Sequence, residues 1–281
     1  MYITYDGINL NLTLTDEITL ATWSQSFTVN ILAVVGGNTA YVGFTGGTGG
    51  LTSSQKLLAW TYLAGAPIVP NYPTGFDGVG LTLNGGAALN GTRLRLTDGN
   101  ADEARSAFYT VPVNVQQFTT SFEFQLTNPN ADGFTFTIQE AGPTALGDSG
   151  GGLGYAGMHT SAAVKFDLYS NSGEGPDSTG LYTNGASPTV PAVNLSGTGI
   201  NLHSGDLFNA QITYNGATLT VVITDTVTNA SATQNYTVNI PSIVNSPTTA
   251  YVGFTGGTGG LTAVQDILNW SYAATAVTAA P

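Results

Sequence analysis

Residues 121–138 read SFEFQLTNPNADGFTFTI, and this stretch decides the fold. Its two runs, 121–126 and 133–138, alternate apolar with polar residues, which is the period of a β-strand with one buried face. The Asn-Gly pairs at 90–91 and 215–216 are strong short signals for hairpins between such strands. The sequence therefore predicts an all-β protein built as an antiparallel two-sheet sandwich.

Composition narrows the class of protein further. The chain has 281 residues, of which 42% are hydrophobic and only 8% are charged, so it can bury a sizeable core. Its net charge of -12 repels a phosphate backbone and an anionic membrane surface, so we expect no nucleic acid partner and no membrane insertion. The absence of cysteine excludes disulfide scaffolds and thiolate metal sites.

An internal repeat sets the domain boundaries. Residues 40–52 (AYVGFTGGTGGLT) recur without change at residues 250–262, and weaker matches flank both copies. We therefore expect a complete unit over residues 67–276 and the C-terminal portion of a preceding unit over residues 1–66. Residues 277–281 are then a tail or the start of a further linker.

The partial copy at residues 1–66 poses a physical difficulty, because a few strands without a partner sheet cannot bury a core. Two interpretations are open. The stretch belongs to a longer tandem chain, or it takes part in strand exchange within a homo-oligomer, docking on residues 67–210 of a neighbour or displacing the chain's own last strands. Residues 65–73, which are rich in proline, have the composition of a stiff linker between the units.

Eight short segments in a fixed order carry a resemblance to a known family. They are residues 81–85, 94–97, 107–109, 118–122, 131–136, 151–155, 164–171 and 251–255. In this order they resemble the legume-type (L-type) lectins of the concanavalin A-like family, here as a bacterial-type tandem repeat. The resemblance implies a jelly-roll sandwich whose loops bind sugar over a calcium ion, with glycans or glycoproteins as partners.

One loop matches the calcium motif of that family. The resemblance makes Asp167 and Asn171 side-chain ligands and Tyr169 a main-chain ligand, and a spacing of two along a strand turns the three toward one face. Calcium prefers oxygen ligands, so a further carboxylate is expected from the same loop. Either Asp177 or Glu174 can supply it, and Asp177 is favoured. On composition alone these residues are also ordinary turn formers.

The chain departs from the plant members of the family at their second, transition-metal site. Those proteins use a glutamate two residues before the shared aspartate and a histidine beyond the loop, whereas this chain has Lys165 and, near the second position, Ser178. Lys165 lies on the same strand face as Asp167, so its ammonium can pair with that carboxylate. We therefore expect one divalent cation per unit, calcium, and no transition metal.

Sugar recognition needs a carboxylate and an amide that face vicinal hydroxyls, a backbone N–H and an apolar surface for the ring. By the motif match, Asp132, Asn171 and Gly151 supply the polar groups. The resemblance also implies that the peptide bond between Asp132 and Gly133 is cis.

The last loop, residues 256–262, would form the variable wall of the sugar site, with Gly260 and Leu261 as contact residues. Turn chemistry alone also accounts for its glycines. The glycines therefore leave the sugar specificity open.

An aromatic platform for the sugar ring is expected, and Tyr155, Tyr182 and Phe134 are candidates. Most aromatic side chains are expected in the core instead. Trp60 and Trp270 stand at matching positions of the repeat, and packing is the preferred interpretation for both.

The same sandwich hosts glycoside hydrolases, which need two carboxylates about 5 to 10 Å apart across a cleft. The glutamates of the complete unit are dispersed, and no Ser/His/Asp arrangement, P-loop or zinc motif is recognisable. We therefore expect no enzymatic activity.

A structural or filament-forming surface repeat is the second interpretation. The presence of Asp132, Gly151 and Asn171 beside the calcium motif favours binding instead, with a role in adhesion. The protein is expected to be secreted or on the cell surface. Because residues 1–4 lack the start of a secretory signal, we expect any signal to lie outside this chain.

Overall fold

The computed structural model describes residues 1–5, 7–36, 40–62 and 69–274. The chain divides into two compact units, Met1–Ile68 and Val69–Pro281, and each is described by itself. The predicted tail at 277–281 and residues 65–68 of the predicted linker lie outside the described residues. Within the described ranges, no helix has the length and apolar character needed to span a bilayer.

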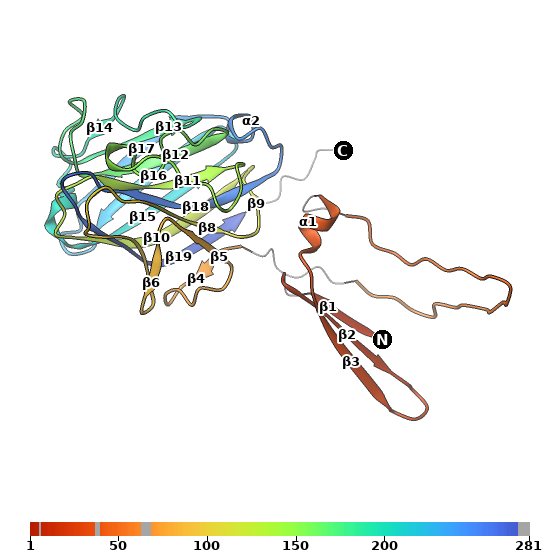
Figure 1. Ribbon diagram of the computed structural model, residues 1–281. Helices are drawn as coiled ribbons and strands as arrows, with labels where there is room; N and C mark the ends of the chain where they lie inside the picture. Colours follow the sequence, from red (N-terminus) through yellow and green to blue (C-terminus); the bar gives the residue numbers. More distant parts are fainter. Residues whose placement is uncertain (6, 37–39, 63–68, 275–281) are drawn as a thin grey trace. The chain divides into compact units, whose positions relative to one another are not determined.

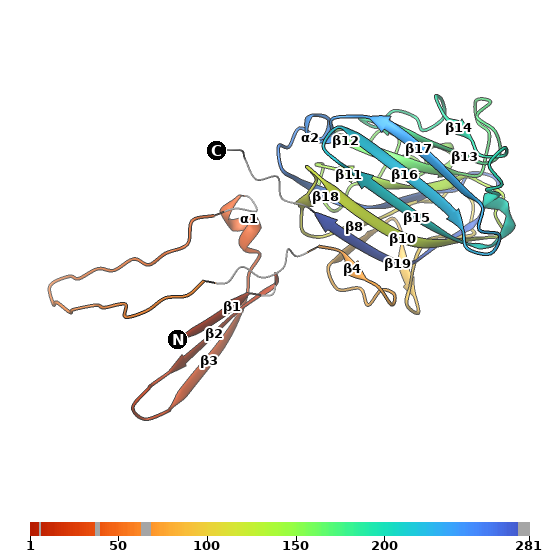
Figure 2. The same cartoon turned by 180° about the vertical axis from the view of Figure 1, so that it is seen from behind.

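The second unit is a sandwich of two eight-stranded sheets (Figures 1 and 2). The back sheet runs in the order β17 (Ser231–Thr237), β16 (Thr218–Asp225), β15 (Leu207–Tyr214), β10 (Phe118–Thr127), β19 (Val264–Ala274), β7 (Arg93–Asp98) and β6 (Ala88–Asn90), with β4 (Asn71–Tyr72) on β19. The front sheet runs in the order β14 (Val193–Asn194), β13 (Ser178–Thr183), β12 (Ser161–Asp167), β11 (Gly133–Gln139), β18 (Thr249–Gly257), β8 (Ala104–Tyr109) and β5 (Leu81–Asn84), with β9 (Val113–Asn114) on β18. Short helical turns lie at η1 (Gly150–Gly152), η2 (Leu202–Ser204) and α2 (Ile240–Ile243).

The predicted all-β antiparallel two-sheet sandwich is therefore confirmed. Both predicted hairpins form, since β6 pairs with β7 and β15 pairs with β16 around the two Asn-Gly turns. The linker assignment differs in part. Residues 71–72 were assigned to the linker but form β4, where Trp270 pairs with Tyr72.

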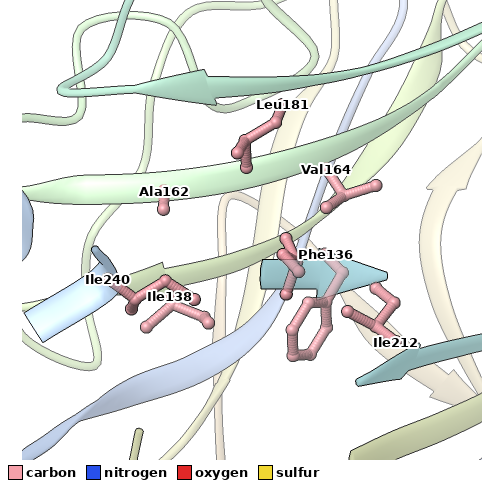
Figure 3. Close-up of a pocket in the computed structure, with 8 residues that line it drawn as sticks. Phe136, Ile138, Ala162, Val164, Leu181, Ile212 and Ile240 are labelled. Carbon is pink, nitrogen blue, oxygen red and sulfur yellow. The ribbon is translucent and has the colours of Figure 1, made fainter. Parts of the chain in front are cut away.

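The core lies between the sheets and is largely aromatic. Along β10 every second side chain is buried, and Phe122 and Phe124 meet Phe134, Phe166 and other rings at centroid distances from 4.9 to 6.4 Å. Trp270 is fully buried and donates from Nε1 to Thr120 Oγ1 at 2.9 Å, so its packing role is as expected. Elsewhere between the sheets, eight apolar side chains line a void of about 10 Å³ (Figure 3), which has room for one water at most.

The front sheet is buried on both faces at its centre. All residues of β11 and β12 are buried, including threonines that a strand with one solvated face would expose. Thr135 Oγ1 lies 2.7 Å from Thr255 Oγ1, and Thr255 Oγ1 donates to the Leu153 carbonyl at 2.7 Å. The loop that carries η1 thus covers the outer face of this sheet, and the polar side chains beneath it are satisfied by hydrogen bonds.

The described residues of the first unit, 1–5, 7–36 and 40–62, form no comparable core. Strands β1 (Tyr2–Tyr5), β2 (Asn9–Thr15) and β3 (Thr22–Thr28) form a three-stranded sheet, followed by α1 (Ile31–Val35). Residues 40–62 contain no strand, and the side chains there are exposed. Trp60 is 51% exposed, so the packing role expected for it is not realised within this unit.

Candidate functional site

Three adjacent strands of the front sheet end at the same place. In the ladder, Gly133 at the start of β11 pairs with Asp167 at the end of β12 and with Gly257 at the end of β18. Because antiparallel neighbours present opposite ends at one edge, the loops before β11, after β12 and after β18 must leave the sheet together. Candidate residues as far apart in sequence as Asp132 and Leu261 are therefore brought to one end of the sandwich.

These loops and η1 enclose a pocket of about 350 Å³. Its lining consists of Ala131, Asp132, Gly150, Gly151, Tyr169, Asn171, Gly259, Gly260 and Leu261. All five residues predicted to contact sugar are in this set. The volume lies within the range of small-ligand sites.

Asp132 forms the floor of the pocket, where its side chain is 5% exposed. The Oδ2 atom is buried and has no hydrogen-bond partner among the described residues. Burial raises the pKa of this carboxyl, and the backbone N–H of Gly259 opposes the shift. A buried acceptor without a donor is costly, so this oxygen is suited to accept a hydrogen bond from a ligand hydroxyl.

The predicted cis peptide bond is displaced by one position. The cis bond joins Ala131 to Asp132, not Asp132 to Gly133, so the prediction was wrong in detail. Leu168 donates its backbone N–H to the Asp132 carbonyl at 2.7 Å, which ties the residue to the loop after β12.

Gly151 lies directly against Asn171. A Cβ at position 151 would lie 2.8 Å from Asn171 Nδ2 and 2.9 Å from Oδ1, so the amide can occupy its place only because residue 151 has no side chain. The predicted backbone donor and the predicted amide thus adjoin one another in the pocket wall.

The exposed aromatic ring of the pocket is Tyr169, which is 42% exposed. The three predicted platform residues were wrong, because Tyr155, Tyr182 and Phe134 are all buried. Tyr155 accepts hydrogen bonds from Ser161 and Gly185, and Phe134 stacks on Phe166. Tyr169 was predicted only as a main-chain ligand. Tyr169 lies two residues beyond β12, a strand that ends at the pocket. This position is the sequence signal that could have identified its ring as part of the pocket.

The wall formed by residues 258–261 is anchored at its first residue. The fully buried Thr258 donates from Oγ1 to the Asn100 carbonyl at 2.7 Å and accepts from the Glu103 N–H at 3.0 Å. Beyond this anchor Gly260 has open space around it and Leu261 is 52% exposed. The wall therefore combines a fixed base with an exposed apolar tip.

On β12, two residues before Asp167, Lys165 is fully buried and surrounded by oxygen atoms. Its Nζ donates to Asp167 Oδ2 at 2.8 Å and to the carbonyls of Pro188 and Thr189 at 2.9 Å each. Glu174 Oε1 lies 3.8 Å away. The ammonium thus lies among acceptors that would suit a metal ion, and the expected pairing with Asp167 is present.

Two carboxylates share this one ammonium. Burial raises the pKa of Asp167 to about 6, although Lys165 acts in the opposite direction. Burial also acts to raise the pKa of Glu174, but the backbone N–H groups of residues 171, 172 and 174 and the charge of Lys165 outweigh it and hold this pKa below its ordinary value. Glu174 Oε1 is buried and accepts no hydrogen bond from the described residues. The cluster therefore carries an excess of negative charge.

The two carboxylates proposed as the later ligand differ in their surroundings. Asp177 Oδ1 accepts from the Leu202 N–H at 2.8 Å and lies 3.0 Å from His203 Nδ1. Glu174 instead faces Lys165 and acts on the pKa of Asp167. The geometry therefore favours Glu174 over Asp177 as the carboxylate that shares a cation with Asp167.

The donors of this loop fit calcium. Among the described residues no group of three or more His, Cys, Asp and Glu side chains could hold a metal by itself. Amide and main-chain oxygens would have to complete the set of ligands. Calcium accepts such oxygen ligands, whereas most transition metals do not prefer them. The buried, unpartnered Glu174 Oε1 is the observation that supports this fit. Asp167, Tyr169, Asn171 and Glu174 are the residues that would hold the ion.

Comparison with known proteins identifies relatives of the second unit. The family model described as legume lectin domain matches residues 71–281. A protein named lectin from Lens culinaris subsp. culinaris is 29% identical over 220 residues, which cover 70% of this chain and 76% of that protein.

Solved structures agree with this match. The seed lectin of Lotus tetragonolobus superposes with a TM-score of 0.63 at 28% identity, covering 73% of this chain and 97% of its own. Peanut lectin in complex with a nine-residue peptide gives a TM-score of 0.66 at 24% identity, covering 76% and 100%, and supports the fold alone. The sandwich is therefore of the jelly-roll type found in these lectins.

Proposed function

The chain belongs to the legume lectin domain family, and from this premise we propose that it is a calcium-dependent glycan-binding protein that acts in adhesion. Members of the family bind carbohydrate and are not enzymes, so the prediction of no enzymatic activity is confirmed at the level of the family.

One observation carries the proposal. Five residues chosen for sugar contact come from four separate segments of the chain, and all of them line one pocket. The pocket offers a buried carboxylate oxygen in need of a donor at Asp132, an amide at Asn171 and backbone at Gly151. Tyr169 and Leu261 add the apolar surface that a sugar ring needs.

Each group has a task that follows from its chemistry. The Asp132 carboxylate accepts from a sugar hydroxyl, and the Asn171 amide can donate and accept at a neighbouring one. A calcium ion, when bound, would supply positive charge that balances the carboxylates of Asp167 and Glu174, and it would fix the loop that carries Asn171. Lys165 already neutralises part of that charge, so the proposal includes one divalent cation and no transition metal.

The proposal places the protein outside the cell or on its surface, where glycans and glycoproteins are its partners. A pocket open to solvent and walled by glycines holds few contacts, so a single site is expected to bind weakly. Adhesion by a weak site becomes effective when several sites act together on one glycan-coated surface.

A glycan array tests the proposal with calcium and with a chelator. We expect binding to one class of glycan that disappears on chelation. The variant Asp132→Asn keeps the shape of the side chain but removes its charge, and we expect it to lose about tenfold or more in affinity. The matched control is Asp77→Asn, because Asp77 lies on an exposed turn of the same unit.

Other outcomes would favour the alternatives. Binding to no glycan would support a structural, filament-forming role, and binding that ignores chelation would remove calcium from the proposal. Release of reducing ends from a bound oligosaccharide would point to a hydrolase instead.

A further inference from the structure

The first unit repeats the strand register of the second. We call residues 207–274, which form β15 to β19, the closing segment, and residues 69–206 the opening segment. In β1 and β2 Ile3 pairs with Leu12, just as Ile212 pairs with Val221 in β15 and β16. In β2 and β3 Leu10 pairs with Phe27, as Leu219 pairs with Tyr236. Residues 1–28 therefore form the same meander as the start of the closing segment.

Side-chain contacts are repeated as well. Tyr5 donates to the Val29 carbonyl at 3.0 Å, and Tyr214 donates to the Val238 carbonyl at 3.1 Å. Asn30 caps α1 as Asn239 caps α2. These contacts depend on residues within each meander and its following helix, so they form in both units.

Contacts are also repeated further along the chain, between residues 40–62 and the end of the closing segment. Gln55 donates to the Gly47 carbonyl at 3.0 Å, as Gln265 donates to Gly257. The rings of Phe44 and Trp60 lie 5.2 Å apart, and those of Phe254 and Trp270 lie 5.0 Å apart. Residues 40–62 thus keep these two contacts of the closing segment although they contain no strand.

Burial is what differs. Val42, Phe44 and Trp60 are 54%, 52% and 51% exposed, whereas Val252, Phe254 and Trp270 are fully buried. The reason is the set of neighbours. In the second unit β18 pairs with β8 and β11, and β19 pairs with β7 and β10, all of which come from the opening segment. The described residues of the first unit contain no counterpart of these four strands.

We infer that residues 2–62 are a second closing segment, preformed to complete a lectin sandwich with a polypeptide equivalent to the opening segment. The exposed apolar face of Val42, Phe44 and Trp60 is the surface that this partner covers. Within the sandwich of this same chain, the identical residues 250–262 show what covers such a face.

Within the described residues, the opening segment at 69–206 already pairs with the closing segment at 207–274. The occupant is therefore a further opening segment, of the kind that residues 69–206 form. This inference is independent of sugar binding, because it depends on strand pairing alone.

The test adds that partner to the full chain. A second copy of residues 69–210 is joined directly to Tyr2, which occupies the position of Gln211 in the register. We expect amide hydrogens of residues 40–62 to exchange on the order of 100-fold more slowly than in the unmodified chain. Peptides that include residues 53–56 distinguish this copy, because Ser53, Ser54 and Lys56 differ from Ala263, Val264 and Asp266.

The matched control joins residues 69–274 to the chain instead, so that the added copy brings its own closing segment. One closing segment should then stay unprotected. The variant Val42→Asp provides a second test. It should leave the unfolding midpoint of the unmodified chain unchanged. In the first fusion it should remove the slower amide exchange of residues 40–62. Unprotected residues 40–62 in the first fusion would overturn the inference, as would a stable dimer of the unmodified chain that buries them.

Discussion

At the scale of single residues, Lys165 places a positive charge among buried oxygen atoms. Its ammonium is fully buried and donates to one carboxylate and two carbonyls. Such a shell of oxygen atoms is one in which proteins place a cation. Because the charge is part of the side chain, this position needs no metal. The sequence predicted this pairing from the two-residue spacing between Lys165 and Asp167.

Replacing Lys165 by methionine tests its role. The variant Lys165→Met leaves Asp167 and Glu174 without their ammonium, and breaking a buried ion pair in this way costs about 3 to 5 kcal/mol. We expect the free energy of unfolding in urea to fall by that amount. Lys56→Met is the control, because Lys56 is exposed and its loss should change nothing. An unchanged unfolding midpoint for Lys165→Met would mean that the pair is not needed.

Asp167 makes calcium binding depend on pH. Its pKa in the fold without metal is about 6, and the ion binds only the ionised carboxylate, so protons compete below that pH. We expect calcium affinity to be constant above about pH 7 and to fall roughly tenfold per unit below about pH 6. Calorimetric titration at a series of pH values measures this, and a constant affinity down to pH 5 would contradict it.

The same shift fixes the sign of a stability effect. A carboxyl whose pKa is raised on folding stabilises the fold below its unfolded pKa near 3.8, and this contribution is lost as the pH rises through about 6. Calcium favours the ionised form and should remove this loss. Without calcium, the melting temperature should therefore fall as the pH rises from near 3.8 through about 6. With calcium, this fall should be absent.

Gly151 provides a prediction that separates the pocket from the fold. In Gly151→Ala the new Cβ would lie within 2.9 Å of three atoms of Asn171, so the amide must move. We expect glycan affinity to fall at least about tenfold, while the melting temperature of the sandwich changes little. Gly197→Ala is the control, because nothing lies within 4 Å of a Cβ there. Equal affinities for the two variants would contradict the role of Asn171.

At the scale of elements, the site depends on three strand ends and their loops. The register that pairs Gly133 with Asp167 and with Gly257 is what brings the loops together. Individual strands were predictable from alternation, and hairpins from Asn-Gly turns. The burial of both faces of β11 was not predictable, because alternation reports the residue types of a strand and says nothing of a loop from elsewhere that covers them.

The buried aromatic residues illustrate the same difficulty. Tyr155 lies in a glycine-rich motif and Tyr182 in a strand motif, both near the predicted site. Their rings nevertheless lie in a buried cluster beneath the covering loop. Sequence order located the loops correctly but could not say on which side of a loop a ring would lie. Glu174 and Asp177 differ for a comparable reason, since η2 supplies partners for Asp177 from 25 residues away.

The anchor of the pocket wall gives a prediction at this scale. Thr258→Val removes the hydroxyl that bonds Asn100 and leaves the buried N–H of Glu103 without its acceptor. We expect a loss of about 1 to 3 kcal/mol in the free energy of unfolding, and weaker glycan binding because the wall loses its fixed base. Thr233→Val on the exposed face of β17 is the control. A stable variant with full affinity would show that the wall needs no anchor.

At the scale of the whole molecule, one sequence has two structures. Residues 250–262 run through β18 into the pocket wall, whereas the identical residues 40–52 contain no strand. The Gln–Gly hydrogen bond and the Phe–Trp ring contact recur in both copies, so the difference arises from the strands available for pairing. The repeat was visible in the sequence, but its consequence needed the structure, because β propensity becomes a strand only beside a partner.

The most direct measurement is a crystal structure of the protein grown with calcium and with the glycan selected on the array. The account predicts one cation, about 2.3 to 2.6 Å from oxygen atoms of Asp167, Asn171 and Glu174, and a sugar whose hydroxyls bond Asp132. It predicts no anomalous signal of a transition metal beside Lys165. A glycan bound elsewhere, or a sugar seated on Asp132 with no cation beneath it, would contradict the account.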